Sequence, residues 1–328
     1  GTIGPERTIA PGTAVGSTLT CTATADDGDG GTVSGNATAT VTNTPPVMTS
    51  VSITPDTGAV GATLTCVATA TDEDGEDITY SYGWEDGTEG DSYTISAANT
   101  PGDTLTCTAT ATDVTGGTVS GTAEATVTNT DPVVTATVTP STAKVGDTLT
   151  CDATASDADG DEPSLSYAWS TGATGADYVV TASDDPGATI VCTATATDAD
   201  GGTATAEASA SIENTPPVLV SVNVTPDTGA AGDTLTCEAT ATDADGGTPA
   251  ITFAWDDGTA GATRSVPTGL SAGTELVCTA TATDADGGTG SASASATVTN
   301  TGPVMGSVSV TPVDPTNDDT LTCTATAT

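Results

Sequence analysis

Cysteine and aspartate are the residues of this sequence whose types and spacing could do chemistry. Every cysteine except the last is followed six residues later by an aspartate, and a second aspartate follows two residues further on in every case except Thr115. Cysteines form disulfides or bind metals as thiolates. Carboxylates gathered without basic partners repel one another unless a cation lies between them. The aspartates in question are Asp27, Asp29, Asp72, Asp74, Asp113, Asp157, Asp159, Asp198, Asp200, Asp243, Asp245, Asp284 and Asp286.

The composition argues against catalysis. The 328 residues include no histidine and only three basic residues, Arg7, Lys144 and Arg264. Histidine is the commonest general base and nitrogen ligand. The acids recur in every repeat, whereas a catalytic site is normally a single departure from such a pattern. We therefore expect no enzyme activity and no catalytic residue.

The net charge limits the partners of the chain. A formal charge of −41 repels nucleic acid and anionic membrane surfaces, which bind through basic patches. No apolar run approaches the roughly 18 residues of a membrane-spanning helix. We expect no nucleic-acid partner and no membrane insertion of this segment.

The cysteines define an internal repeat. Cys66, Cys151, Cys237 and Cys323 are spaced by 85, 86 and 86 residues, and a second series interleaves with them. A tryptophan lies 18 residues after the first cysteine of each complete pair. Such periodicity indicates a tandem array of one structural unit of about 86 residues. The second cysteine series is Cys21, Cys107, Cys192 and Cys278, the tryptophans are Trp84, Trp169 and Trp255, and linker asparagines in the same phase are Asn43, Asn129, Asn214 and Asn300.

Residues around each cysteine alternate with period two, which predicts strands with one buried face and one wet face. In TLTCEATAT, Leu235 and Cys237 point to one side and the threonines to the other. The stretches ITYSYGW, LSYAW and ITFAW alternate in the same way, and no stretch has a helical pattern. We expect an all-β protein. The predicted inward residues of these three stretches are Ile78, Tyr80, Tyr82, Trp84, Leu165, Tyr167, Trp169, Ile251, Phe253 and Trp255.

The order cysteine, tryptophan, cysteine resembles the immunoglobulin-like Greek-key sandwich. The turn after the tryptophan, as in AWDDGT, also resembles PKD-type repeats, and the whole chain is similar to tandem immunoglobulin-like/PKD-like arrays of large bacterial or archaeal surface proteins. One feature departs from antibody domains, because Leu105, Ile190 and Leu276 stand where a tyrosine usually precedes the second cysteine by two residues.

The resemblance implies one disulfide between strands B and F of each repeat. No CxxC spacing and no histidine favour a zinc site instead. Closing a loop of about 42 residues contributes around 4 kcal/mol in the chain-entropy model. Disulfides in every repeat predict a secreted, extracellular or cell-surface protein. The implied pairs are Cys66 with Cys107, Cys151 with Cys192, and Cys237 with Cys278.

The repeat phase predicts domain boundaries near residues 44, 130, 215 and 301. Residues 45–130, 131–215 and 216–301 are complete repeats, whereas 1–44 and 302–328 are partial ones. Two interpretations of the partial repeats compete. Either Cys323 of one chain pairs with Cys21 of the next, or the sequence is part of a longer repetitive polymer, which we favour.

In the sandwich that the chain resembles, the B–C and F–G turns lie at the pole where the linker enters. Acid pairs and a linker asparagine would meet there, and Ca²⁺ accepts such an oxygen set. The alternative is plain solvated turns, since Asp and Gly favour turns, or weak and diffuse cation binding. The first complete repeat, with Thr115, is predicted to bind most weakly. The candidate ligands are Asp72, Asp74, Asp113, Asp157, Asp159, Asp198, Asp200, Asp243, Asp245, Asp284, Asp286, Asn43, Asn129 and Asn214.

Near-identical repeats favour a structural function. We predict a subunit of an extracellular filament, stalk or sheath that contacts further copies of itself. The alternative is the repetitive rod of a cell-surface adhesin that presents a tip, outside this sequence, to glycans or a receptor. An accessory segment of a large secreted hydrolase is a third interpretation.

Overall fold

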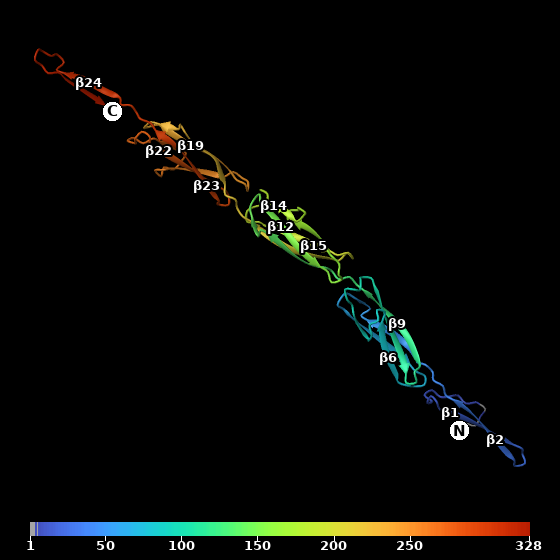
Figure 1. The fold of residues 1–328 in the computed structure, drawn as a ribbon. Coiled ribbons are helices and arrows are strands. Elements are labelled where there is room, and N and C mark those ends of the chain that lie inside the picture. The colour runs from blue at the N-terminus through green and yellow to red at the C-terminus, as the bar shows by residue number, and fades with distance from the viewer. Residues whose placement is uncertain (1–3, 5) are drawn as a thin grey trace. The chain divides into compact units, whose positions relative to one another are not determined.

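Alternating small and hydroxyl-bearing residues form strands throughout the chain. The structure is a computed structural model that describes residue 4 and residues 6–328. All regular elements in this part are strands, and none is a helix of the length and hydropathy that crossing a bilayer requires. Strands follow one another in three seven-stranded sets, with a two-stranded sheet before them and another after them (Figure 1).

The strands of the three complete sets have closely matching lengths. The first set is β3 (Val47–Thr54), β4 (Thr57–Gly58), β5 (Thr63–Thr71), β6 (Ile78–Trp84), β7 (Ser92–Thr94), β8 (Thr104–Asp113) and β9 (Thr118–Val127). The second is β10 (Val133–Thr139), β11 (Thr142–Ala143), β12 (Thr148–Ser156), β13 (Ser164–Trp169), β14 (Asp177–Val179), β15 (Thr189–Thr197) and β16 (Thr203–Ile212). The third is β17 (Val218–Thr225), β18 (Thr228–Gly229), β19 (Thr234–Thr242), β20 (Ala250–Trp255), β21 (Thr263–Ser265), β22 (Glu275–Thr283) and β23 (Thr289–Val298).

Each set forms two sheets. In the first set the orders are β3-β5-β7 and β4-β9-β8-β6, and the other two sets repeat them. The short strand β4 pairs with β9 in parallel, whereas β8 pairs with β6 and β9 antiparallel. The strands correspond to A, B and E in one sheet and to A′, G, F and C in the other. This topology confirms the all-β, tandem immunoglobulin-like fold.

The two end sheets contain the remaining cysteines. They are β1 (Thr18–Asp26) with β2 (Thr32–Thr40), and β24 (Met305–Thr311) with β25 (Thr322–Ala327). Cys21 in β1 and Cys323 in β25 are exposed thiols. The chain divides into two compact units, and the division between them passes through the second complete set. The repeat boundaries inferred from the sequence therefore stay predictions.

The core of each sandwich is a disulfide packed beside an indole. Cys107 lies opposite Trp84 in the β6–β8 ladder, and Cys278 lies opposite Trp255 in the β20–β22 ladder. The Trp84 indole N–H donates a hydrogen bond of 3.1 Å to the carbonyl of Gly90. The disulfides Cys66–Cys107, Cys151–Cys192 and Cys237–Cys278 each span 6.4 Å between Cα atoms, and all six cysteines are fully buried.

Two residues predicted to point into the core are largely exposed. Tyr80 is 37% exposed and Leu165 is 36% exposed, whereas Trp84 and Trp169 further along the same strands are buried. Both strands lie at a sheet edge, and the two residues lie near the B–C turn, away from the disulfide. The Tyr80 hydroxyl accepts a hydrogen bond of 2.8 Å from the amide of Ala70. Tyr80 therefore links the sheet edge to β5 and adds little to the core.

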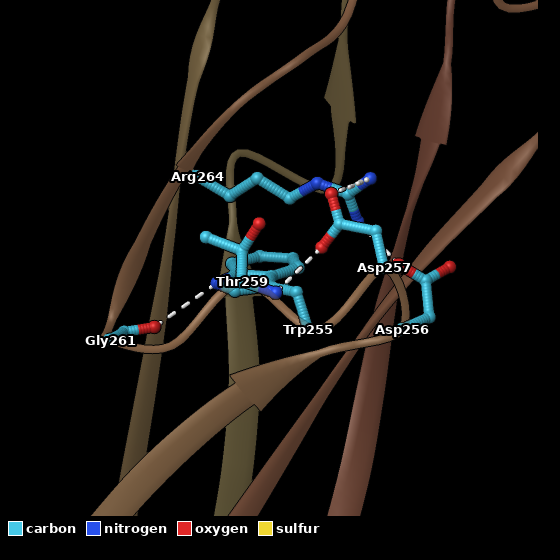
Figure 2. A network of polar contacts seen from close by, with 6 residues as sticks. All are labelled: Trp255, Asp256, Asp257, Thr259, Gly261 and Arg264. Atoms are coloured by element: carbon cyan, nitrogen blue, oxygen red, sulfur yellow. Dashed lines mark hydrogen bonds and ion pairs between the residues drawn. The ribbon is translucent and has the colours of Figure 1, made fainter.

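The third sandwich has an arginine where the others have a tyrosine. Tyr93 and Tyr178 pack against Trp84 and Trp169 with ring centroids 5.0 and 5.5 Å apart. At the matching place, Arg264 lies over Trp255, with its guanidinium carbon 5.7 Å from the ring centroid. Figure 2 shows its guanidinium end beside Asp256 and Asp257, with which it forms ion pairs.

We expect Arg264→Ala to lower the unfolding free energy of the third sandwich. The arginine is only 7% exposed, but its acidic partners are partly solvated, so the expected loss is about 1–2 kcal/mol. Arg264→Tyr, which copies the other sandwiches, should lose less because the aromatic contact replaces the cation. Urea unfolding monitored by hydrogen exchange in β22 measures both variants. An equal loss for alanine and tyrosine would show that the ring contact contributes nothing here.

Candidate cation site at each linker

Two acidic turns and a linker meet at one end of each sandwich. In the first sandwich the B–C turn joins β5 to β6, and the F–G turn joins β8 to β9. The side-chain amide of Asn43, in the linker before β3, donates to Asp113 of the F–G turn at 3.0 Å. The main-chain N–H of Thr44 donates to Asp74 of the B–C turn at 2.7 Å. The linker is thus hydrogen-bonded to both turns.

The second and third sandwiches repeat this arrangement. Asn129 donates to Asp198, and Asn214 donates to Asp284, both at 3.0 Å. The following residue donates its N–H to the B–C turn in each case, from Thr130 to Asp159 and from Thr215 to Asp245. These contacts bring together acids that lie about 40 residues apart in the sequence.

A glycine makes the close approach possible. A Cβ atom at Gly117 would lie 2.4 Å from Oδ2 of Asp113 and 2.7 Å from Nδ2 of Asn43. Gly202 and Gly288 are crowded by the matching Asp and Asn atoms. The second glycine of the F–G turn is therefore required by the close approach of the aspartate and the linker asparagine.

In the first aspartate of each turn, one carboxylate oxygen accepts hydrogen bonds from N–H groups of the same turn. Oδ1 of Asp113 accepts hydrogen bonds from the N–H groups of Thr115 and Gly117 at 2.9 and 2.8 Å. In the B–C turn, Oδ1 of Asp72 accepts the N–H of Asp74 at 2.7 Å. These bonds are those of ordinary Asx turns, so the turn interpretation accounts for half of each carboxylate.

Two oxygens of each site, one from the linker asparagine and one from the B–C turn, are left without partners. In all three sandwiches the linker asparagine Oδ1 and the first B–C aspartate Oδ2 are buried and accept no hydrogen bond within the described residues. Buried polar atoms without a protein partner are rare in native proteins, where a bound water or ion usually satisfies them. A hard cation that takes six to eight oxygen ligands would satisfy them. The atoms belong to Asn43 and Asp72, to Asn129 and Asp157, and to Asn214 and Asp243.

The first sandwich contains an acid that spacing from cysteine did not identify. Oε2 of Glu76 is a further buried oxygen without a partner. Burial raises the pKa of Glu76, and the nearby charges of Asp113, Asp72 and Asp74 raise it further. Glu76 follows the B–C glycine, a position occupied by Asp161 in the second sandwich and by Gly247 in the third. An alignment of the repeats would have revealed it.

The second sandwich gathers the most acids. Partial desolvation by its neighbours raises the pKa of the Asp200 carboxyl, although the residue is exposed, and the charges of Asp161, Asp198, Asp159 and Asp157 raise it further. The linker adds Asp131, where the other linkers have Pro45 and Pro216, and a Cβ atom at Gly202 would lie 2.6 Å from Oδ1 of Asp131.

The acidic side chains of each site lie near one another but do not form a complete coordination shell for one ion within the described residues. Among the described residues, no three His, Cys, Asp or Glu side chains are placed as ligands of one ion. Asp74, Asp159 and Asp245 are hydrogen-bonded to linker N–H groups, whereas Asp200 and Asp286 are exposed at the tip of the F–G turn. The residues fit a cation through their buried oxygens, and closure requires the exposed carboxylates to turn inward.

The linker contact makes stability depend on pH. The Asn43 amide is the main reason that the pKa of Asp113 is lowered to about 2, below about 3.9 in an unfolded chain. A lowered folded pKa stabilises the protein above the unfolded value, and this contribution disappears as pH falls from about 4 to about 2.

We expect Asn43→Ala to flatten the acid limb of the stability curve of the first sandwich. Urea midpoints at pH values across that window, with EDTA present, test this expectation. Asn36→Ala, at an exposed position in β2, is the matched control. If the urea midpoint falls with pH equally in both variants, the Asn43–Asp113 bond does not contribute to the acid dependence of stability.

No protein-family model and no curated protein matches the chain. Among solved structures, the protocadherin GammaB4 extracellular domain is 18% identical with a TM-score of 0.35, and the match covers 95% of this chain and 61% of that one. Drosophila N-cadherin EC1-4 is 12% identical over 86% and 84% of the two chains, with a TM-score of 0.31. A Ca²⁺-stabilized adhesin with which an Antarctic bacterium binds ice is 19% identical over 86% and 82%, with a TM-score of 0.29. At these TM-scores the likenesses carry no inference about ligands or partners.

Proposed function

We propose that this chain is a structural segment of an extracellular filament, stalk or sheath, in which Ca²⁺ binds where a linker enters each immunoglobulin-like sandwich. The carrying observation is the pair of buried oxygens without partners that recurs in all three sandwiches. The structural units are the repeats 45–130, 131–215 and 216–301. No residue is assigned a catalytic role.

The disulfides support an extracellular location. Each complete sandwich has one fully buried disulfide. Such bonds persist in oxidising compartments and are rare in the cytosol. The surrounding core is small, because many of the buried positions beside the cysteines are alanines, such as Ala109, Ala194 and Ala280. A protein exposed outside the cell gains from covalent closure of such a core.

The linker residues select a cation by their orientation. Asp113 accepts the NH₂ end of the Asn43 amide, which leaves the carbonyl end of that amide without a partner. The turn N–H of Asp74 likewise engages one oxygen of Asp72 and leaves the other. Each pair therefore presents oxygens only, which suits Ca²⁺ better than zinc or another metal that prefers nitrogen or sulfur. The net charge of −41 raises the local concentration of any cation.

Calcium titration of the intact chain tests the proposal. We expect saturable binding by calorimetry, and Ca²⁺ at about 100 times its dissociation constant should raise the unfolding free energy of an occupied sandwich by about 2.7 kcal/mol. Asp157→Asn should weaken binding to the second sandwich. Asp152→Asn, an exposed acid in β12 of that sandwich, removes the same charge away from the linker and serves as the control. Absence of saturable binding, or equal loss in both variants, would refute the calcium site.

The acids around each linker predict the relative affinities of the three sites for Ca²⁺. The second site has Asp131 and Asp161 in addition to the shared set and should bind most tightly. At the first site, Glu76 stands near the shared acids and offsets Thr115, which occupies the place of an acid. Glu76→Gln should therefore weaken the first site more than Glu73→Gln, a substitution of an exposed neighbour.

The proposed partner is a further copy of the same chain. Each copy is strongly acidic, so lateral association requires divalent ions or salt to screen the repulsion. Light scattering should show larger particles with Ca²⁺ than with EDTA at low ionic strength. Particle sizes that do not respond to either would contradict association through screened charge.

A further inference from the structure

Aspartate followed by glycine is a chemically reactive step, and this chain contains several. Glycine has no side chain to obstruct its own amide nitrogen, so that nitrogen reaches the preceding aspartate carboxyl group more easily than at other residues. The steps begin at Asp27, Asp29, Asp74, Asp86, Asp159, Asp200, Asp245, Asp257 and Asp286.

Most of these carboxylates are held by hydrogen bonds. In the B–C turns, Asp74, Asp159 and Asp245 accept the linker N–H, and Asp159 also accepts the hydroxyl of Thr130 at 3.1 Å. Asp159 is only 6% exposed. Three others accept N–H groups of their own turns, namely Asp27, Asp86 and Asp257.

The second acids of the F–G turns are different. Asp29, Asp200 and Asp286 are exposed, and their own N–H groups donate to the first acid of the turn. No described residue donates a hydrogen bond to their carboxylates. These side chains are free to rotate toward the next amide, whereas those of the B–C turns must first break a bond to the linker.

We propose that Asp200–Gly201 and Asp286–Gly287, together with Asp29–Gly30 in the end sheet, are sites of spontaneous isoaspartate formation, and that the linker protects the B–C steps. The glycine nitrogen attacks Cγ of the aspartate, a new N–C bond forms, and one water leaves to give a cyclic succinimide. Water then attacks the former main-chain carbonyl carbon of the aspartate and breaks the bond between that carbon and the glycine nitrogen. The main chain now runs through the former side chain, with no net change in atoms and no oxidation or reduction.

The consequence lies in the F–G turn. Isoaspartate adds one methylene to the main chain and moves the carboxylate to the former main-chain position. Asp200 and Asp286 lie close to Asp198 and Asp284, which hold the linker asparagines. Modification would thus alter the contact between the F–G turn and the linker asparagine.

Ageing of the full-length chain tests the proposal. The protein is incubated at neutral pH in EDTA, and isoaspartate is located by methyl transfer from S-adenosylmethionine with an isoaspartyl methyltransferase and by electron-transfer fragmentation of peptides. We expect Asp200 and Asp286 to convert about tenfold faster than Asp159 and Asp245, the factor that one lost hydrogen bond gives. Asp200→Glu should abolish the signal in its own peptide and leave that of Asp286 unchanged.

A reduced sample in urea supplies the comparison. In the unfolded chain all of these steps should convert at similar rates, because the hydrogen bonds are gone. Equal rates in the folded chain would overturn the proposal. So would a folded chain that forms no isoaspartate at Asp200 or Asp286 while the unfolded chain does.

Discussion

The double variant Cys237→Ala/Cys278→Ala should lose about 4 kcal/mol of unfolding free energy in the third sandwich, the entropy of closing its loop. The disulfide joins β19 to β22, one strand from each sheet, and both cysteines are fully buried. A sandwich with a stability of about 5–15 kcal/mol would lose a large part of it. Hydrogen exchange in peptides of β19 and β22 measures this loss separately from the other sandwiches.

The chain offers its own control for this experiment. Cys21→Ala and Cys323→Ala remove exposed thiols that form no disulfide here and should leave exchange in the third sandwich unchanged. The second sandwich, which keeps Cys151–Cys192, should also exchange as before. Rapid exchange throughout the chain would show that the sandwiches do not unfold independently. An unchanged third sandwich would show that its alanine-rich core is sufficient without the disulfide.

Trp255→Ala should lower the stability of the same sandwich by about 3–5 kcal/mol. The indole is only 3% exposed, faces Cys278 across the ladder, and donates to the carbonyl of Gly261 at 3.1 Å. The alanines of the same core cluster, Ala294 and Ala296, are too short to fill the space that the substitution would leave.

Trp255→Phe separates the ring from its hydrogen bond. Phenylalanine keeps most of the apolar contact and loses the N–H donor, for which about 1 kcal/mol is expected beyond the smaller ring. Urea unfolding of both variants, followed by exchange in β20 and β22, gives the two values. If the phenylalanine variant is as unstable as the alanine variant, the bond to Gly261 outweighs packing.

The repeat made much of the fold predictable. Alternation around Leu235 and Cys237 has period two, and one buried face follows from that period alone. Each tryptophan stands at a fixed distance from both cysteines of its repeat, and in the first sandwich Trp84 lies opposite Cys107. The alternation wrongly predicted that Tyr80 and Leu165 are buried. The period of a strand predicts the face on which a side chain lies, but it does not predict whether a second sheet covers that face.

The candidate site was predictable as a set of residues and not as a set of atoms. Repetition drew attention to acids shared by all repeats, so Glu76 and Asp131, which differ between repeats, escaped notice. Arg264 stood out in the sequence as one of three basic residues, but its ion pairs with Asp256 and Asp257 were not predicted, since Ser170 and Thr171 occupy those places in the second sandwich. Which oxygen of Asp72 is used by its turn depends on local hydrogen bonds that composition cannot report.

The hydrogen bonds of Asn43 and Thr44 also suggest how a sandwich would respond to a pull on its linker. A pull on the linker reaches Asp74, just after β5, and Asp113, at the end of β8, before it reaches β3. Those two strands are the ones that Cys66 and Cys107 join covalently. We therefore expect part of any force on the linker to pass to the two strands that the sulfur–sulfur bond holds together.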